Sequence, residues 1–232
     1  NLCHTVYMTT RKPHAESRAQ MRKGIITHGT RLLEKHGHAG LSLREVARSM
    51  GVAPSALYRH VKNRDELLTV LLVESFNRVA DHVEKATHTA TTPHARLHAL
   101  THALLEWAHR HPQQWALMYG TPVPNYAAPA ESTNEPGTRV LTLFVHTVAG
   151  FDLGTEPASQ ELKEELARGA TDLGAEMSPE RATGAVLAWT SLIGLINAVQ
   201  FGQLGPELTD LGSDLLDSWL RNLLGTQTSR TL

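Results

Sequence analysis

The feature that most constrains this chain is the helical spacing of its apolar residues, which continues over most of its 232 residues. Apolar side chains recur at every third or fourth position, and no convincing run alternates apolar and polar residues as a strand would. The pattern predicts an all-α protein. Helices are expected over 15–36, 42–51, a short stretch from 54, 63–85, 93–111, 112–119, 138–150, 159–173, 179–203 and 207–224, with a proline-containing loop over 120–137.

Charge is unevenly divided along the sequence, although the formal net charge is only −1. Residues 1–68 hold 12 Lys and Arg against 5 Asp and Glu, whereas residues 69–232 hold 10 against 18. A basic first part and an acidic second part favour an electrostatic partner for the first part alone. Nucleic acid is the usual partner of such a segment.

The sequence also indicates where the protein works. A single cysteine, Cys3, permits no intrachain disulfide and fits a reducing compartment. We find neither a signal peptide nor an apolar run as long as a membrane span, so we expect a soluble, cytoplasmic protein without a membrane partner. Because Met8 is a plausible start, residues 1–7 are interpreted as an expression remnant.

Residues 41–61 carry the pattern of a helix-turn-helix. Ser42 with Glu45 forms a capping-box pattern, Gly51 ends the first helix, and Pro54 suits the first turn of the next. Small side chains make the start of the second helix slim enough for a DNA major groove. Its second half is predicted to carry hydroxyl, imidazole and cationic groups that suit phosphates. The predicted DNA contacts are Ser42, Arg44, Ser55, Tyr58, Arg59, His60 and Lys62.

The segment LSLREVARSMGVAPSALYRHVKNRDELL, residues 41–68, resembles the tetracycline-repressor (TetR) family of transcriptional regulators. The resemblance implies that Tyr58 and Lys62 bind phosphates and that Arg44 reads a base. The sequence departs from the family at Ala53, Pro54 and Ala56, where relatives often carry longer polar side chains. Base recognition by the second helix should then depend on Ser55, Arg59 and contacts to thymine methyl groups.

The segment WALMYGTPVPNYAAP, residues 115–129, resembles one TetR subgroup, named for a Trp-His-Gly signature. Trp189 and Gly194 match that signature, but Ile193 stands where the histidine would lie. The resemblance therefore implies this subgroup without the role of its histidine.

Residues 179–203 and 207–224 are apolar on more than one face, so each needs more than one partner. Small side chains on the first would allow a close helix–helix approach. We expect the two helices to form a four-helix homodimer interface, with a seam inside one subunit as the alternative. The predicted interface residues are Gly184, Ala188, Ser191, Leu195, Ala198, Gly202, Leu216 and Trp219.

A small-molecule effector pocket is expected between the helices 63–85, 94–110 and 138–150. Aromatic side chains would form its walls, although each is also an ordinary core residue, and polar side chains would orient the effector. The predicted effector-binding residues are His102, Trp107, Trp115, Phe144, His146, Phe151 and Asn197.

Several alternatives stay open. His94, His98 and His102 recur four residues apart, a spacing at which helical imidazoles can share zinc or nickel; a solvated polar face is the preferred interpretation, and no metal or other cofactor is predicted. A helical enzyme is disfavoured because the sequence lacks a nucleophile elbow, a phosphate loop and a metalloprotease helix. An architectural DNA binder is disfavoured by the large acidic part.

These observations predict a DNA-binding domain at 15–62 and an effector-binding and dimerisation domain at 63–226, with tails at 1–14 and 227–232. The predicted function is a homodimeric transcriptional repressor. It would bind a palindromic double-stranded DNA operator and be released by a small effector.

Overall fold

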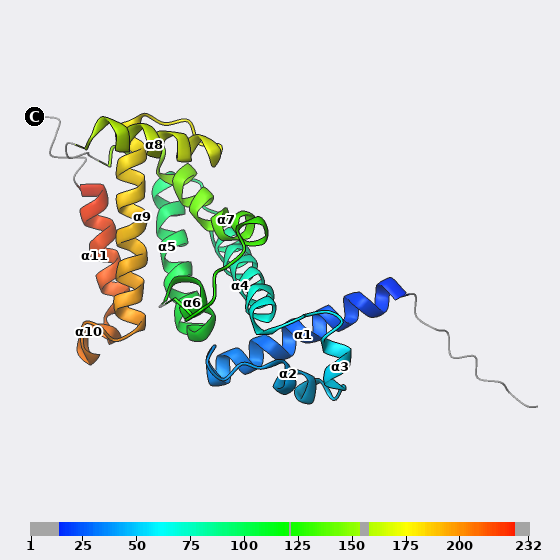
Figure 1. Ribbon diagram of the computed structural model, residues 1–232. Coiled ribbons are helices and arrows are strands. Elements are labelled where there is room, and N and C mark those ends of the chain that lie inside the picture. The colour runs from blue at the N-terminus through cyan, green and yellow to red at the C-terminus, as the bar shows by residue number, and fades with distance from the viewer. Residues whose placement is uncertain (1–13, 121, 154–157, 226–232) are drawn as a thin grey trace, which may run out of the picture. The chain divides into compact units, whose positions relative to one another are not determined.

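The computed structural model describes residues 14–120, 122–153 and 158–225 (Figure 1). In these ranges the chain forms eleven α-helices and no strand, which confirms the all-α fold. It divides into two compact units between Leu71 and Leu72, within a helix, whereas the predicted boundary precedes that helix. The predicted tails fall outside the described residues, except that His14 begins the first helix.

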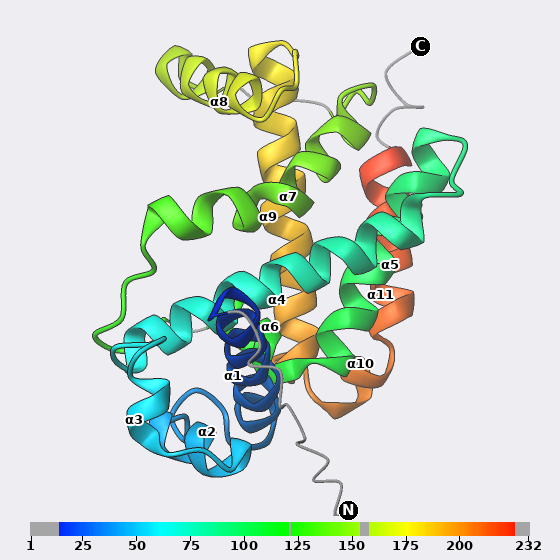
Figure 2. The ribbon, with the colours of Figure 1, turned by 90° about the vertical axis from the view of Figure 1, so that its right-hand side faces the viewer.

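The first unit consists of α1 (His14–His36), α2 (Leu43–Met50), α3 (Pro54–Leu57) and the start of α4 (Arg64–Thr87). Helix α2 packs against both α1 and α3, as Figure 2 shows. Apolar side chains from all four helices form a small core whose fully buried members include Ile25, Leu33, Val46, Leu57 and Leu67.

The second unit is organised around α9, which packs against six other helices (Figure 1). Helix α9 spans Pro179–Gln200. The six helices around it are α5 (Pro93–Arg110), α6 (Pro112–Tyr119), α7 (Ala130–Val148), α8 (Gln160–Asp172), α10 (Pro206–Asp210) and α11 (Gly212–Gly225). Their apolar faces form a continuous core that includes Trp115, Phe144, Leu192 and Ile196.

Helix α9 is long and apolar enough to pass a length-and-composition test for a membrane span, with a mean hydropathy of 1.6 over 18 residues. An apolar run of this length was not predicted from the sequence. In the structure, 44% of that window is buried against other parts of the chain. Because the core helix of a soluble protein passes the same test, this composition agrees with the central position of α9.

The two largest differences from the expected element bounds lie in the second unit. The first helical turns of α7 occupy part of the predicted loop, with Pro136 inside the helix. A proline removes a helical hydrogen bond, but packing holds this segment in place: Thr133 is buried, and a Cβ on Gly137 would lie 3.5 Å from the ring of Phe76. The helix expected over 207–224 divides near Gly212, which is buried directly against Val199.

Candidate nucleic-acid interface

The turn between α2 and α3 has the local construction that the sequence predicts. The Oγ of Ser42 accepts a hydrogen bond from the N–H of Glu45 at 3.2 Å and caps α2. Gly51 ends that helix with φ of 69°, a left-handed conformation that glycine adopts without strain, and its N–H donates to the carbonyl of Arg48. Pro54 then begins α3, where a missing N–H removes no helical bond. These caps fix where α3 starts.

Helix α3 is shorter than predicted, because it ends at Leu57. Tyr58, Arg59 and His60 therefore lie in the turn that follows, not in the second half of a helix. The N–H groups of His60 and Val61 both donate to the carbonyl of Leu57, at 2.8 and 3.0 Å. These bonds, with the burial of Leu57 and Val61, tighten the chain into a turn and anchor the residues between them.

All seven predicted DNA contacts lie in the first unit, and none of them is buried. Tyr58 is 47% exposed, which is unusual for a large aromatic side chain. Within the described part of the chain, no carboxylate lies within ion-pair distance of Arg44, Arg59 or Lys62. The five exposed residues are Arg44, Ser55, Tyr58, Arg59 and Lys62, and the two half-buried ones are Ser42 and His60.

The backbone at Lys62 is held by the start of α4. Its N–H donates to Oε2 of Glu66 at 2.6 Å, and the N–H of Glu66 donates to Oδ1 of Asn63 at 2.9 Å. Arg64 adds a tertiary bond, because its guanidinium donates to the carbonyl of His38 at 2.7 Å. Sequence reasoning missed this positioning role of Arg64, which depends on a contact between residues 26 positions apart.

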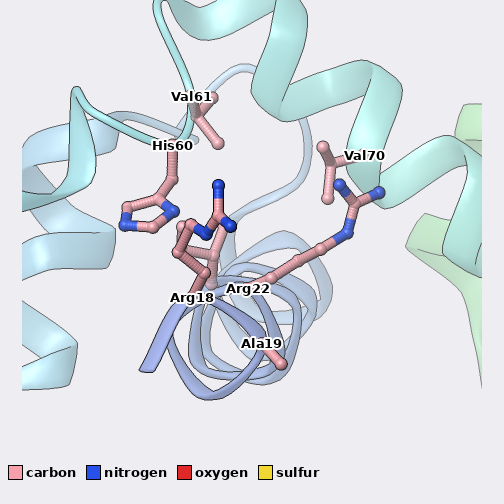
Figure 3. A pocket seen from close by; sticks show the side chains of 7 residues that line it. Arg18, Ala19, Arg22, His60, Val61 and Val70 are labelled. Atoms are coloured by element: carbon pink, nitrogen blue, oxygen red, sulfur yellow. The ribbon is translucent and has the colours of Figure 1, made fainter. Parts of the chain in front are cut away.

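A groove of about 250 Å³ adds basic groups that the sequence analysis did not single out (Figure 3). Arg18 and Arg22 rise from α1 into the groove, with one guanidinium beside the imidazole of His60 and the other extended toward Val70. Both arginines are exposed, and they lie one helical turn apart. Their i, i+4 spacing on the first helix was the available signal for a shared basic face.

Most of the predicted effector residues are packed into the core of the second unit or hydrogen-bonded to it. Four of them are packed into the core of the second unit and are at most 4% exposed: Trp107, Trp115, Phe144 and Phe151. Asn197 is engaged with this core, because its Oδ1 accepts a hydrogen bond from Nε1 of Trp115 at 2.8 Å and its amide donates to the carbonyl of Tyr119 at 3.0 Å.

The two predicted effector histidines lie elsewhere in the second unit. Nε2 of His102 is 2.7 Å from Oδ1 of Asp217, whereas the exposed His146 has its Nε2 3.2 Å from the carbonyl of Leu173. An open groove of about 390 Å³ occurs instead among α4, α6, α7 and the segment before α7. Its lining includes Phe76, Met118, Tyr126, Thr133, Asn134 and Thr138.

The predicted dimer face is only partly on the surface. Gly184, Ala188 and Leu216 are buried within the chain, as the alternative of a seam inside one subunit would place them. Ser191 and Trp219 hydrogen-bond to each other, with Nε1 of Trp219 donating to Oγ of Ser191 at 2.9 Å. Accessible members of the predicted set are the exposed Ser191 and Gly202 and the half-buried Leu195, Ala198 and Trp219.

Comparison with known proteins assigns both units. The sequence profile described as "Bacterial regulatory proteins, tetR family" matches residues 25–71, and that of "Tetracyclin repressor-like, C-terminal domain" matches residues 97–223. The HTH-type transcriptional regulator Rv1816 of Mycobacterium tuberculosis is 36% identical over 220 residues, which cover 91% of this chain and 93% of the relative.

The chain belongs to the TetR family. The crystal structure of the regulatory protein SCO4313 has the same TetR-family architecture, with a TM-score of 0.72 and 30% identity over 92% of this chain and 99% of that one. FadR from Bacillus subtilis, solved with stearoyl-CoA, shares the fold at a TM-score of 0.53 and 14% identity, covering 87% of this chain and 97% of its own.

Family membership makes the protein a transcriptional regulator, not an enzyme. TetR-type regulators bind DNA, and the helix-turn-helix of this chain lies within the N-terminal match. The C-terminal match covers the helices from within α5 to α11. The Trp-His-Gly subgroup stays a prediction.

Proposed function

We propose that this TetR-family protein is a cytoplasmic repressor that binds a palindromic operator as a homodimer and leaves it when a small effector binds. The observation that carries the DNA-binding part is the set of exposed side chains Tyr58, Arg59 and Lys62, whose two cations have no carboxylate partner among the described residues. Such cations suit phosphates, because a cationic side chain that binds a DNA phosphate releases the counterions condensed there.

The proposed contacts divide into two kinds. Phosphates would be bound by the phenol of Tyr58, the ammonium of Lys62 and the imidazole of His60. These contacts would fix the register of the first unit on the duplex. Arg44 and Ser55, exposed on α2 and α3, would reach base edges, since a guanidinium can form two hydrogen bonds with guanine. The remaining two predicted contacts, Ser42 and Arg59, would support the backbone or base contacts beside them.

Arg18 and Arg22 extend the proposed phosphate surface. They share a groove with His60, so a phosphate passing there would meet a guanidinium of α1 and the imidazole of the turn after α3. Guanidinium groups suit this role because they bind phosphate oxygens with two parallel hydrogen bonds.

Dimerisation would place the helix-turn-helix motifs of the two protomers about 34–36 Å apart on successive major grooves, as a palindrome requires. Support comes from the apolar surface left open in the second unit. Leu187 on α9 is 58% exposed, and further large apolar side chains are exposed at Phe201, Leu204, Leu208 and Leu211. A second copy of the chain would cover such a surface, together with the accessible members of the predicted face.

The effector would bind in the groove among α4, α6 and α7, not among the four core aromatics. Phe76 and Met118 supply apolar walls, and Tyr126, Thr133 and Asn134 supply polar atoms for orientation. The groove includes residues of α4, the helix that continues into the first unit, so an effector that favours one conformation of α4 could change DNA affinity. The stearoyl-CoA bound to FadR makes long acyl compounds reasonable first probes.

The DNA-binding proposal is tested by footprinting the DNA upstream of the protein's own coding region and then measuring affinity for the protected fragment. Lys62→Ala should weaken binding and reduce the slope of log K against log salt by about 1.8 in magnitude, because the homodimer loses one phosphate contact in each of its two protomers. Lys85→Ala, which removes an exposed cation from the far end of α4, is the matched control. Equal effects of the two substitutions would reject the proposed phosphate contact.

A further inference from the structure

Two histidines of α5 and one aspartate of α11 bring metal-binding atoms together in the second unit. The rings of His98 and His102 stack with centroids 4.2 Å apart and planes inclined by 21°. Their Nε2 atoms lie 3.6 and 2.7 Å, respectively, from the same oxygen, Oδ1 of Asp217. One ligand atom from each residue falls within 4.8 Å of the other two.

The three side chains are accessible to an ion from solvent. They lie at the junction of α5 and α11, which pack against each other (Figure 2). His98 and Asp217 line an open groove of about 570 Å³, and the side chain of His98 is 60% exposed. Arg221 lines the same groove, and its guanidinium donates to Oγ of Ser218 on its own helix.

The structure also changes which residues form this cluster. His94, at the same helical spacing, packs its ring edge-on against Phe151 with centroids 4.8 Å apart. Glu106, the carboxylate farther along α5, pairs with His82 and Arg110. The third donor is instead Asp217, which is 115 residues from His102 in the sequence.

We propose that His98, His102 and Asp217 form a binding site for a divalent transition-metal ion, with zinc as the best match. Two imidazoles and one carboxylate are a donor set that zinc accepts, leaving the fourth position for water. Magnesium and calcium, by contrast, favour sites made of oxygen ligands. The proposal is independent of the proposed operator and effector.

The distances from Oδ1 of Asp217 to the two imidazole nitrogens are close to those between the ligand atoms of a zinc ion. Zinc bonds of about 2.0–2.1 Å place neighbouring tetrahedral ligand atoms roughly 3.3 Å apart. The separation between His98 and Asp217, 3.6 Å, is already close to that value. The 2.7 Å separation between His102 and Asp217 is a hydrogen bond, which should lengthen as the ion takes its place. The ion would then join α5 directly to α11.

The test measures Zn²⁺ binding to the full chain by isothermal titration calorimetry. Cys3 and His4 could also bind zinc, so the parent protein and every variant made from it carry Cys3→Ser and His4→Ala. We expect one ion per chain and, for His102→Ala or Asp217→Asn, affinity at least about tenfold weaker, since even indirect loss of ligand support costs about 10–100-fold. His109→Ala, which removes an exposed histidine from the same helix, should stay within about twofold of the parent.

Thermal unfolding separates loss of the site from loss of the fold. Asp217→Asn keeps the shape of the side chain and should unfold near the parent temperature without metal, whereas added Zn²⁺ should raise the melting temperature of the parent and not of this variant. The proposal is overturned if the parent does not bind zinc. Equal zinc affinity in the parent, His102→Ala and Asp217→Asn would overturn it as well.

Discussion

Replacing Asn197 by alanine should destabilise the second unit even without any ligand. Asn197 was expected to contact an effector, but the structure places its amide between Nε1 of Trp115 and the carbonyl of Tyr119, at 2.8 and 3.0 Å. Trp115 has no exposed surface. Its indole N–H would therefore lose its partner inside the core.

The size of the effect follows from these two bonds. An unsatisfied buried donor costs about 1–3 kcal/mol, and the second hydrogen bond contributes about 0.5–1.5 kcal/mol. Asn197→Ala should therefore lower the free energy of unfolding by about 2–4 kcal/mol, a large share of the roughly 5–15 kcal/mol typical of a protein. Trp115→Phe should also destabilise, because it removes the same hydrogen bond and part of a fully buried ring.

Urea unfolding followed by tryptophan fluorescence measures this effect selectively, because all four tryptophans lie in the second unit. The double variant should be less destabilised than the sum of the single variants by about 1–2 kcal/mol, since their common hydrogen bond is lost only once. Asn222→Ala, at an exposed position of α11, should change stability by no more than about 0.5 kcal/mol. Additive effects at Asn197 and Trp115 would refute the proposed coupling. An unchanged stability of Asn197→Ala would restore this residue as a candidate effector contact.

Three further predictions concern the dimer, the effector groove and pH. Leu187→Glu should shift the protein toward monomer in sedimentation experiments, whereas Leu162→Glu on α8 should not, although both leucines are exposed; equal behaviour would place the interface elsewhere. Thr138→Trp should fill the groove and abolish an effector response that Ser132→Trp on the same helix retains, with DNA affinity kept in both; a retained response in Thr138→Trp would exclude the groove. Burial raises the pKa of Tyr119, so its contribution to stability should be complete below about pH 10 and decline as the unfolded chain ionises above it. Tyr119→Phe should reduce this alkaline loss in urea titrations, and an unchanged loss would contradict the assignment.

The helix-turn-helix of the first unit was largely predictable, because its geometry depends on local signals. Ser42, Gly51 and Pro54 each satisfy or remove specific backbone hydrogen bonds within a few residues, so their roles can be inferred from spacing alone. The early end of α3 was missed, because the burial of Leu57 and Val61 and two bonds to one carbonyl decide it.

The effector site was less predictable because periodicity shows which face of a helix is buried, not whether the interior contains a space. Trp115 and Phe144 follow the helical period, and the structure packs both completely. The open groove instead includes Tyr126 from a segment without helical spacing. Likewise, no local pattern connects His102 with Asp217, because only the folded chain brings α5 and α11 together.

The small residues of α9 show why a helix-packing pattern does not identify the partner. Gly184 and Ala188 permit close packing, but the chain already buries both of them. Their spacing predicted a close approach without distinguishing a helix of the same chain from one of a second copy. Leu187, between them in the sequence, points to solvent. A large exposed leucine on an otherwise apolar helix is therefore a better indicator of what remains to be covered than the small residues beside it.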